Sequence, residues 1–319
     1  MANVKLIDGG FSSQLSTYVG DIIDGHPLWS SYFLATAKDA VVQTHRDFIK
    51  AGADIVMTNS YQASIGGFME FLDLDYDSSY QLIKSSVDYV KEAIALEATH
   101  ARIRSDDPAR DILIAGSVGP YGASLRDGSE YRGDYVEHVS EATMAEWHRP
   151  RIQALVEAGA DILAIETIPA SKEAHMLCRL LREWPNQKAW LSFSCKDDKH
   201  ISNGESFTQV ARTCYNMNPD QLIAVGVNCV RPLMVSPLIE QLKTENIPLV
   251  VYPNSGERYD AVNARWIDRD LCEPVDKYVT DWLDEGVALV GGCCRTYAED
   301  TLHMKHRLDD WVKQNTARQ

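Results

Sequence analysis

The sequence of 319 residues predicts an α/β protein, a (β/α)₈ TIM barrel that occupies residues 1–319 as a single domain. Short apolar segments follow one another at intervals of about 40 residues, which matches the repeat of such a barrel. Most of these segments are continuously apolar, as expected for parallel strands that are covered on both faces. A glycine recurs between a helical pattern and the next apolar segment, so the chain repeats a unit of helix, glycine and strand.

The apolar segments are interpreted as strands because each is a short run bounded by turn-forming residues. In chain order they are Val4–Asp8, Asp54–Thr58, Ile112–Ser117, Ile162–Glu166, Ala189–Phe193, Ile223–Asn228, Leu249–Tyr252 and Ala288–Val290. An open, doubly wound sheet is the competing architecture. It is disfavoured because Asp8-Gly9-Gly10-Phe11 follows the first strand, where a dinucleotide-binding sheet has a longer glycine-rich fingerprint.

Helices are predicted between the strands. Apolar residues recur at helical spacing over Asp39–Ala51 and again over Arg151–Ala158. Each pattern ends at a glycine, Gly52 or Gly159, directly before the next strand, and Gly286 has the same position before the last strand. Glycine suits the left-handed residue that ends many helices, so these three positions are predicted helix stops.

Composition and charge exclude several kinds of partner. The hydrophobic content of 45% allows a substantial core, and the net charge of −15 argues against nucleic acids and anionic membranes. No segment approaches the roughly 20 apolar residues of a membrane span, and no signal peptide precedes the first strand. Seven cysteines, an odd number, fit a reducing compartment. We therefore expect a cytoplasmic protein, either a monomer or a small homo-oligomer.

Three cysteines are predicted to bind one metal ion. Cys293 and Cys294 follow the last strand and Cys229 follows the sixth. The ends of these strands lie close together at one face of a barrel, where active sites form. Three thiolates around Zn²⁺ leave the fourth position open, which is typical of a catalytic zinc site. A redox-active pair formed by Cys293 and Cys294 is the alternative.

The remaining cysteines and the histidines carry less information. The other four cysteines are expected to be small buried hydrophobic residues: Cys178, Cys195, Cys214 and Cys272. His45 and His148 lie on helical stretches, so we expect surface or satisfied core residues and not metal ligands. Trp29 either walls a substrate pocket or only packs.

Taken together, the motifs resemble those of the zinc-dependent homocysteine S-methyltransferases, and the resemblance spans nearly the whole chain. The shared motifs are Asp8-Gly9-Gly10, Gly226-Val227-Asn228-Cys229 and Gly291-Gly292-Cys293-Cys294. Longer stretches are most similar to the branch of the family that uses S-methylmethionine; they are residues 60–63, 116–123, 127–131 and 251–257.

The resemblance implies an enzyme that moves a methyl group to a zinc-bound homocysteine thiolate and forms methionine. The donor implied is a sulfonium compound, S-methylmethionine or S-adenosylmethionine. Zinc lowers the pKa of a bound thiol enough to deprotonate it. A sulfonium is already an activated leaving group, so no residue is expected to act as a general acid or base.

The resemblance also implies substrate-binding residues. Asp8 and Glu166 correspond to carboxylates that would hold the ammonium group of homocysteine. The amides of Gly9 and Gly10 would approach its carboxylate closely, because glycine has no side chain in the way. Asn228 completes the expected substrate-binding set. The acidic and aromatic residues 127–134 either face a cationic donor or form a solvated loop.

Two other functions remain open at this level. The first is the same zinc site with another methyl donor, namely betaine or a methylated folate or corrinoid. The second is a non-enzymatic zinc or thiol redox sensor. Metal release upon mild oxidation without methyl transfer would distinguish a sensor from an enzyme.

Overall fold

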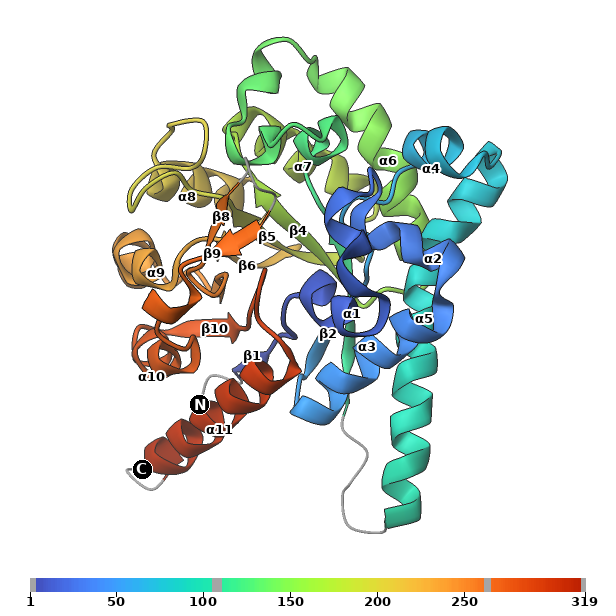
Figure 1. Ribbon diagram of the computed structural model, residues 1–319. Coiled ribbons are helices and arrows are strands. Elements are labelled where there is room, and N and C mark those ends of the chain that lie inside the picture. Colours follow the sequence, from blue (N-terminus) through green and yellow to red (C-terminus); the bar gives the residue numbers. More distant parts are fainter. Residues whose placement is uncertain (1–3, 105–110, 261–264, 317–319) are drawn as a thin grey trace.

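The chain folds into a ring of parallel strands surrounded by helices, as the sequence predicted (Figure 1). The computed structural model describes residues 4–104, 111–260 and 265–316. The barrel strands are β1 (Lys5–Leu6), β2 (Ile55–Met57), β3 (Leu113–Val118), β4 (Ile162–Ile168), β5 (Lys188–Phe193), β6 (Leu222–Asn228), β7 (Leu249–Tyr252) and β10 (Val287–Val290). Their order is β1-β10-β7-β6-β5-β4-β3-β2, and a parallel bridge between Ile7 and Ile55 closes the ring.

At least one helix follows each barrel strand, except that a hairpin comes first after β7. The helices are α1 (Phe11–Val19), α2 (Phe33–Thr36), α3 (Lys38–Ala51), α4 (Ile65–Leu72), α5 (Tyr76–Arg104), α6 (Glu141–Glu157), α7 (Ser171–Leu180), α8 (Phe207–Met217), α9 (Pro232–Ile239), α10 (Asp276–Asp284) and α11 (Ala298–Thr316). Short 3₁₀ segments are η1 (Gly20–Gly25), η2 (Trp29–Tyr32), η3 (Tyr121–Leu125), η4 (Ser129–Tyr131), η5 (Asp134–Glu137), η6 (Leu181–Glu183), η7 (Glu240–Glu245) and η8 (Arg269–Leu271). No described helix is both long and apolar enough to cross a bilayer.

The predicted glycine stops are confirmed. Gly52, Gly159 and Gly286 have φ angles of 106°, 85° and 90°, in the region that residues with a side chain disfavour. The helix predicted over Arg151–Ala158 is the second half of α6. This helix begins ten residues earlier because Ser140 caps it, accepting a hydrogen bond from the Thr143 amide at 3.0 Å.

A large aromatic side chain fills the barrel interior. Trp190 of β5 is fully buried and belongs to an interior cluster with three alanines, Ala115, Ala164 and Ala224, from β3, β4 and β6. Small residues on these strands make room for one large ring, so the barrel is a packed core and not a pore. Space for a ligand is therefore expected at the strand ends and not in the barrel interior.

The loop after β7 contains a hairpin that the sequence did not predict. Strands β8 (Arg258–Asp260) and β9 (Arg265–Ile267) pair antiparallel, with Tyr259 opposite Trp266. Figure 1 shows the hairpin in orange beside the barrel strands. Its residues are mostly charged or polar and give no apolar run, so a search for buried strands passes over them.

Candidate active site

A cavity opens at the carboxyl ends of the barrel strands, where a (β/α)₈ barrel places its active site. It encloses about 1000 Å³ including the solvent at its mouth, enough room for two small molecules. Predicted site residues on its wall are Gly9, Gly10, Glu166, Cys229, Cys293 and Cys294. Asp8 and Asn228 are fully buried and are not among the lining residues.

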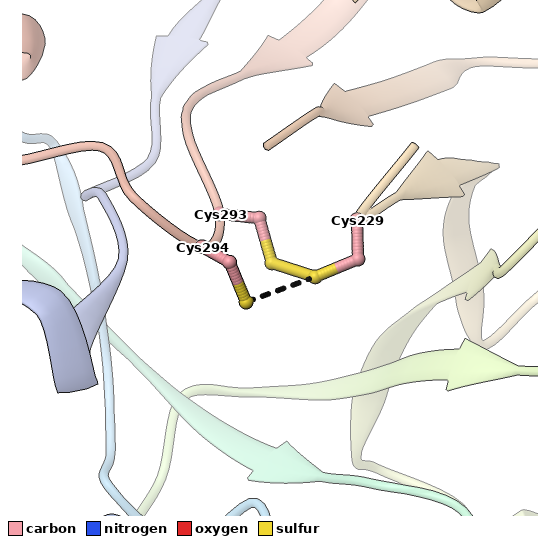
Figure 2. A group of neighbouring side chains, drawn as sticks. All are labelled: Cys229, Cys293 and Cys294. Atoms are coloured by element: carbon pink, nitrogen blue, oxygen red, sulfur yellow. Dashed lines mark hydrogen bonds between the residues drawn. A yellow bond between two sulfur atoms is a disulfide. The ribbon is translucent and has the colours of Figure 1, made fainter. Parts of the chain in front are cut away.

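The three predicted metal ligands lie together. The sulfur atoms of Cys229, Cys293 and Cys294 are all within 4.8 Å of one another. Figure 2 shows Cys293 and Cys294 on one loop and Cys229 facing them from the end of a separate strand. Among the described residues, this is the group of histidine, cysteine and acidic side chains that can hold a metal ion.

The loop after β7 fixes both cysteine loops because β7 lies between β6 and β10 in the sheet. The Cys229 amide donates to the Tyr252 carbonyl at 3.2 Å, and the Cys293 amide donates to the Pro253 carbonyl at 2.8 Å. Two residues after Pro253, the Ser255 amide donates to the Cys294 carbonyl at 3.1 Å. Main-chain bonds therefore set the positions of the thiols, independently of any ion.

Cys229 and Cys293 are joined by a disulfide, which the sequence analysis did not anticipate. The Cys294 sulfur lies 3.6 Å from the Cys229 sulfur. In a tetrahedral site with Zn–S bonds of about 2.3 Å, neighbouring sulfurs are about 3.8 Å apart, so the Cys229–Cys294 spacing suits zinc. The disulfide and a site with three thiolates exclude each other, because a disulfide sulfur is no longer a thiolate ligand.

The glycines of the two motifs let the loops after β1 and β10 pack against each other. A Cβ atom on Gly10 would lie 2.3 Å from the Cys293 carbonyl oxygen, and one on Gly292 would lie 2.2 Å from the Thr296 hydroxyl. The Gly10 amide donates to the Thr296 carbonyl at 3.0 Å. This bond occupies the donor that was expected to bind a substrate carboxylate, so that role of Gly10 stays a prediction that the contacts do not favour.

Asp8 and Glu166 are buried carboxyl groups at the ends of β1 and β4. Asp8 Oδ2 accepts from the Met57 amide at 2.9 Å, whereas Oδ1 has no hydrogen-bond partner among the described residues. Glu166 accepts from the Ser117 hydroxyl. Burial raises the pKa of Asp8 well above its usual value, with the Glu166 charge adding to the effect, and burial raises the pKa of Glu166 to about 7.

Asn228 uses its side-chain amide inside the protein. Its Oδ1 accepts from the Thr167 amide at 2.7 Å and the Ser192 hydroxyl at 2.8 Å, and its Nδ2 donates to the Thr167 hydroxyl at 2.8 Å. These bonds tie the end of β4 to the end of β6, next to Cys229. Substrate binding by Asn228 stays a prediction, and its contacts indicate instead that it positions Thr167 and the adjacent cysteine.

Four aromatic side chains contribute to the lining of the cavity, and we call them the aromatic wall. Trp29, Tyr61, Tyr131 and Trp266 all line it, and the Trp29 and Tyr61 rings meet edge to face at 6.5 Å. Trp29 and Tyr131 were sequence candidates for this wall. Trp266 was missed because it lies on the unpredicted hairpin, and only its indole ring in a polar loop signalled a contact role.

Glu257 connects that hairpin to the cysteine loop. Its carboxylate is 4% exposed and bonds to Arg269 at 3.0 Å and to Arg295 at 3.2 Å. Arg295 lines the cavity and follows Cys294 directly. Neither arginine was a site candidate from the sequence, because an isolated arginine is usually a surface residue.

Unusual backbone conformations concentrate at the cavity. Of the eight non-glycine residues with positive φ in the described parts of the chain, four line it, namely Trp29, Thr167, Cys229 and Arg295. Such conformations cost of order 1–3 kcal/mol each and persist where the surrounding structure enforces them, as it does at functional sites. The backbone thus marks the same location as the cysteines and the carboxyl groups.

Comparison with known proteins shows the family to which the chain is similar over nearly its whole length. The family model described as homocysteine S-methyltransferase matches residues 5–308. Betaine-homocysteine S-methyltransferase of Drosophila melanogaster is 42% identical over 311 residues, covering 94% of this chain and 93% of the relative. Homocysteine S-methyltransferase of Escherichia coli is 38% identical over 307 residues, covering 96% and 95%. Crystal structures of homocysteine methyltransferase MmuM from E. coli, in metallated and oxidized forms, each match with a TM-score of 0.82, 36% identity and 96% coverage of both chains.

Proposed function

The chain belongs to the homocysteine S-methyltransferase family, and we propose that it transfers a methyl group from a sulfonium donor, S-methylmethionine first, to homocysteine on a zinc site. The zinc ligands in this proposal are Cys229, Cys293 and Cys294. A methyltransferase that acts on homocysteine follows from the family itself. The metal, the donor and the residue roles are the proposed part.

The cluster of three sulfurs at the wall of the cavity carries the proposal. Three soft thiolate donors with one open side suit Zn²⁺ better than Mg²⁺ or Ca²⁺, which prefer oxygen ligands. When bound, zinc lowers the pKa of a thiol ligand so that the thiol is held as the nucleophilic thiolate. The structural similarity to the metallated form of the E. coli enzyme also supports this use of the site.

The two buried carboxyl groups orient homocysteine in this proposal. Asp8, which is buried next to Gly9 of the cavity wall, and Glu166, which lines the wall, are both unfavourable as anions, because burial raises both pKa values. An ammonium group beside them supplies the missing positive charge and restores the ionised form. Binding at this point fixes the amino-acid end of homocysteine and leaves its thiol to reach the cysteines.

The aromatic wall suits a methyl donor that carries a positive charge. Trp29, Tyr61, Tyr131 and Trp266 offer ring faces, and rings of this kind attract sulfonium and quaternary ammonium groups. The homocysteine sulfur forms a new bond to the methyl carbon while the bond between that carbon and the donor sulfur breaks. The electron pair of the broken bond stays on the donor sulfur, which leaves as a neutral thioether. The residues need only align the three atoms and exclude water.

Betaine is the second candidate donor. The 42% identity to the betaine-homocysteine enzyme of Drosophila favours it, and its quaternary ammonium group suits the same aromatic wall. The leaving group in that case is a neutral tertiary amine, which likewise needs no proton. The contacts of the wall do not distinguish sulfur from nitrogen as the onium centre, so the donor must be determined by assay.

The test uses reduced, zinc-loaded protein with homocysteine and one donor at a time: S-methylmethionine, S-adenosylmethionine or betaine. We expect methionine to form fastest from S-methylmethionine, and zinc content to fall in the alanine variants of Cys229, Cys293 and Cys294. Cys272→Ala is the matched control, because this thiol lies outside the cluster. Full zinc content in all three cluster variants, or no methionine from any donor, would contradict the proposal.

A further inference from the structure

Arg151 of α6 is a fully buried arginine that binds main-chain carbonyls of two active-site loops. It is 1% exposed, and its Nε donates to the Ala63 carbonyl at 2.6 Å. The two terminal nitrogens donate to the Tyr61 carbonyl at 2.7 Å and the Gly119 carbonyl at 3.0 Å. The loop after β2 and the loop after β3 are thereby joined through one guanidinium group.

A second chain of hydrogen bonds continues from Arg151 to the loop after β3. Arg151 Nη1, which also donates to Gly119, lies 3.3 Å from His148 Nδ1, and His148 Nε2 lies 2.7 Å from Glu173 Oε1. Arginine has no acceptor, so His148 accepts at Nδ1 and donates from Nε2. Glu173 also accepts from the Tyr121 amide at 2.7 Å and from the Tyr135 hydroxyl.

The charges inside this network balance. Because His148 accepts from Arg151 at Nδ1, its ring is neutral, in agreement with the lowering of its pKa by burial, and it connects the guanidinium of Arg151 to the carboxyl group of Glu173. His148, Arg151 and Glu173 are each at most 1% exposed. A buried ion pair of this kind is weak evidence for net stability, since removing its charges from water is costly. This ion pair is better explained by the precise positions that it gives to the loops it binds.

The loops bound by the network carry two residues of the aromatic wall. Tyr61 is itself a carbonyl partner of Arg151, and its ring lines the cavity. A Cβ on Gly119 would lie 2.7 Å from the Tyr61 ring, so the two loops are also in close contact. Tyr131 belongs to the segment between Tyr121 and Tyr135, both of which bond to Glu173.

We propose that Arg151, His148, Glu173 and Tyr135 act as positioning residues that set Tyr61 and Tyr131 for the methyl donor, without contacting either substrate. This inference rests on the proposed function, because it assigns the aromatic wall to the donor. The cysteines and Asp8 are held by bonds outside this network. Glu166 is connected to it only indirectly, because its partner Ser117 accepts a hydrogen bond from Ser60, whose carbonyl lies 3.5 Å from Arg151 Nη2. Donor binding is therefore the step that depends on it.

The experiment compares the parent with Arg151→Lys and Tyr135→Phe in reduced, zinc-loaded form. Lysine keeps the charge but cannot reproduce the planar fork of five N–H donors, and phenylalanine removes one hydroxyl at the far end of the network. We expect the KM for the donor to rise on the order of tenfold in Arg151→Lys, the range of one lost cation–π contact, and less in Tyr135→Phe. The KM for homocysteine and the zinc content should stay within about twofold of the parent.

Gln221→Met is the matched control. Gln221 is a buried residue directly before β6, at the opposite end of the barrel, and its Nε2 donates to the Leu181, Trp184 and Gln187 carbonyls. This variant should lose stability but keep the donor KM. A purely structural network would lower the active fraction in all variants and leave each KM unchanged, which would overturn the inference.

The two proposals fail in different ways. If the parent forms methionine but Arg151→Lys and Tyr135→Phe both keep its donor KM, only the positioning role is wrong. If Arg151→Lys does not fold, Tyr135→Phe alone decides the question. If the parent forms methionine from no donor, the proposed function fails and the positioning role fails with it.

Discussion

Asp8 and Glu166 are buried carboxyl groups whose surroundings disfavour negative charge until a cation joins them. A charge-assisted contact to an ammonium group contributes roughly 1.5–3 kcal/mol, so its loss weakens binding by about ten- to a hundredfold. We expect Glu166→Gln and Asp8→Asn each to weaken homocysteine binding in this range, measured by calorimetry on zinc-loaded protein. Zinc content should not change. Homocysteine affinity equal to that of the parent in both variants would place the ammonium elsewhere.

Glu166 also predicts a pH dependence of homocysteine binding. Burial raises its pKa to about 7 in the free protein, so the group is neutral below that pH and anionic above it. Binding of the ammonium should therefore tighten as the pH rises from 6 to 8. Glu166→Gln should lose this step and keep only the dependence that comes from Asp8 and from the thiol. A parent and a variant with the same pH profile would be incompatible with this assignment.

The same shift predicts how stability depends on pH. Between the usual pKa of 4.5 and the raised value, the folded protein holds a proton on Glu166 that the unfolded chain has released. Stability therefore falls as the pH rises through this window, since the unfolded state binds fewer protons. We expect Glu166→Gln to remove this contribution. The melting temperature of the variant should therefore rise relative to that of the parent as the pH increases from 5 to 8. If the melting temperatures of the parent and of Glu166→Gln change in parallel with pH over that interval, the pKa of Glu166 is not raised.

The packing of loops between elements gives a prediction about glycine. In Gly10→Ala, the new methyl group would lie 2.3 Å from the Cys293 carbonyl oxygen, which is main chain and cannot move alone. The loop after β10 must shift, and zinc affinity should fall at least tenfold although every thiol is retained. Competition with a chelator measures this. The matched control is Gly66→Ala in α4, where a Cβ meets nothing within 4 Å and alanine favours a helix.

The elements that the sequence predicted correctly are those whose surroundings are uniform. The barrel strands have helices on one face and the core on the other, so continuous apolar runs identify them. The hairpin β8–β9 contacts the protein through a few side chains such as Trp266 and carries no such run. The glycine stops were equally readable, because a left-handed residue requires little context.

The sequence indicated those parts of the candidate site that are recognised by residue type, and it did not indicate those parts that arise from packing. Three thiols at strand ends indicate a metal site in almost any arrangement of the loops. The burial of Arg151 was not predictable, because arginine on a helix is normally exposed and only the assembled loops supply its carbonyl partners. The contacts do not favour the expected role of Gly10 in substrate binding, for a similar reason. Its missing side chain makes room for the protein's own backbone at Cys293.

The proposed function gives the molecule as a whole two ways to connect β6 with β10 at the active-site face. One is the Cys229–Cys293 disulfide, which closes a loop with a sequence separation of 64 residues. The other is a zinc ion on all three thiolates. The disulfide stabilises by restricting the unfolded chain and zinc would stabilise by binding the folded site, but only zinc would leave an open position for a substrate.

These two links predict opposite effects of oxidation on activity and on stability. Peroxide should convert the Cys229 and Cys293 thiols to the disulfide, with two electrons passing to the peroxide, and release zinc because two of three ligands are lost. Activity should then disappear, whereas the oxidized protein should exceed the reduced, metal-free protein in stability by about 2–4 kcal/mol, the usual effect of a disulfide. Thiol reductant followed by zinc should restore methyl transfer.

Cys293→Ser removes the disulfide, so peroxide should no longer raise its melting temperature. If oxidized wild-type protein keeps its zinc and its activity, the two links do not compete and the three cysteines are not one metal site.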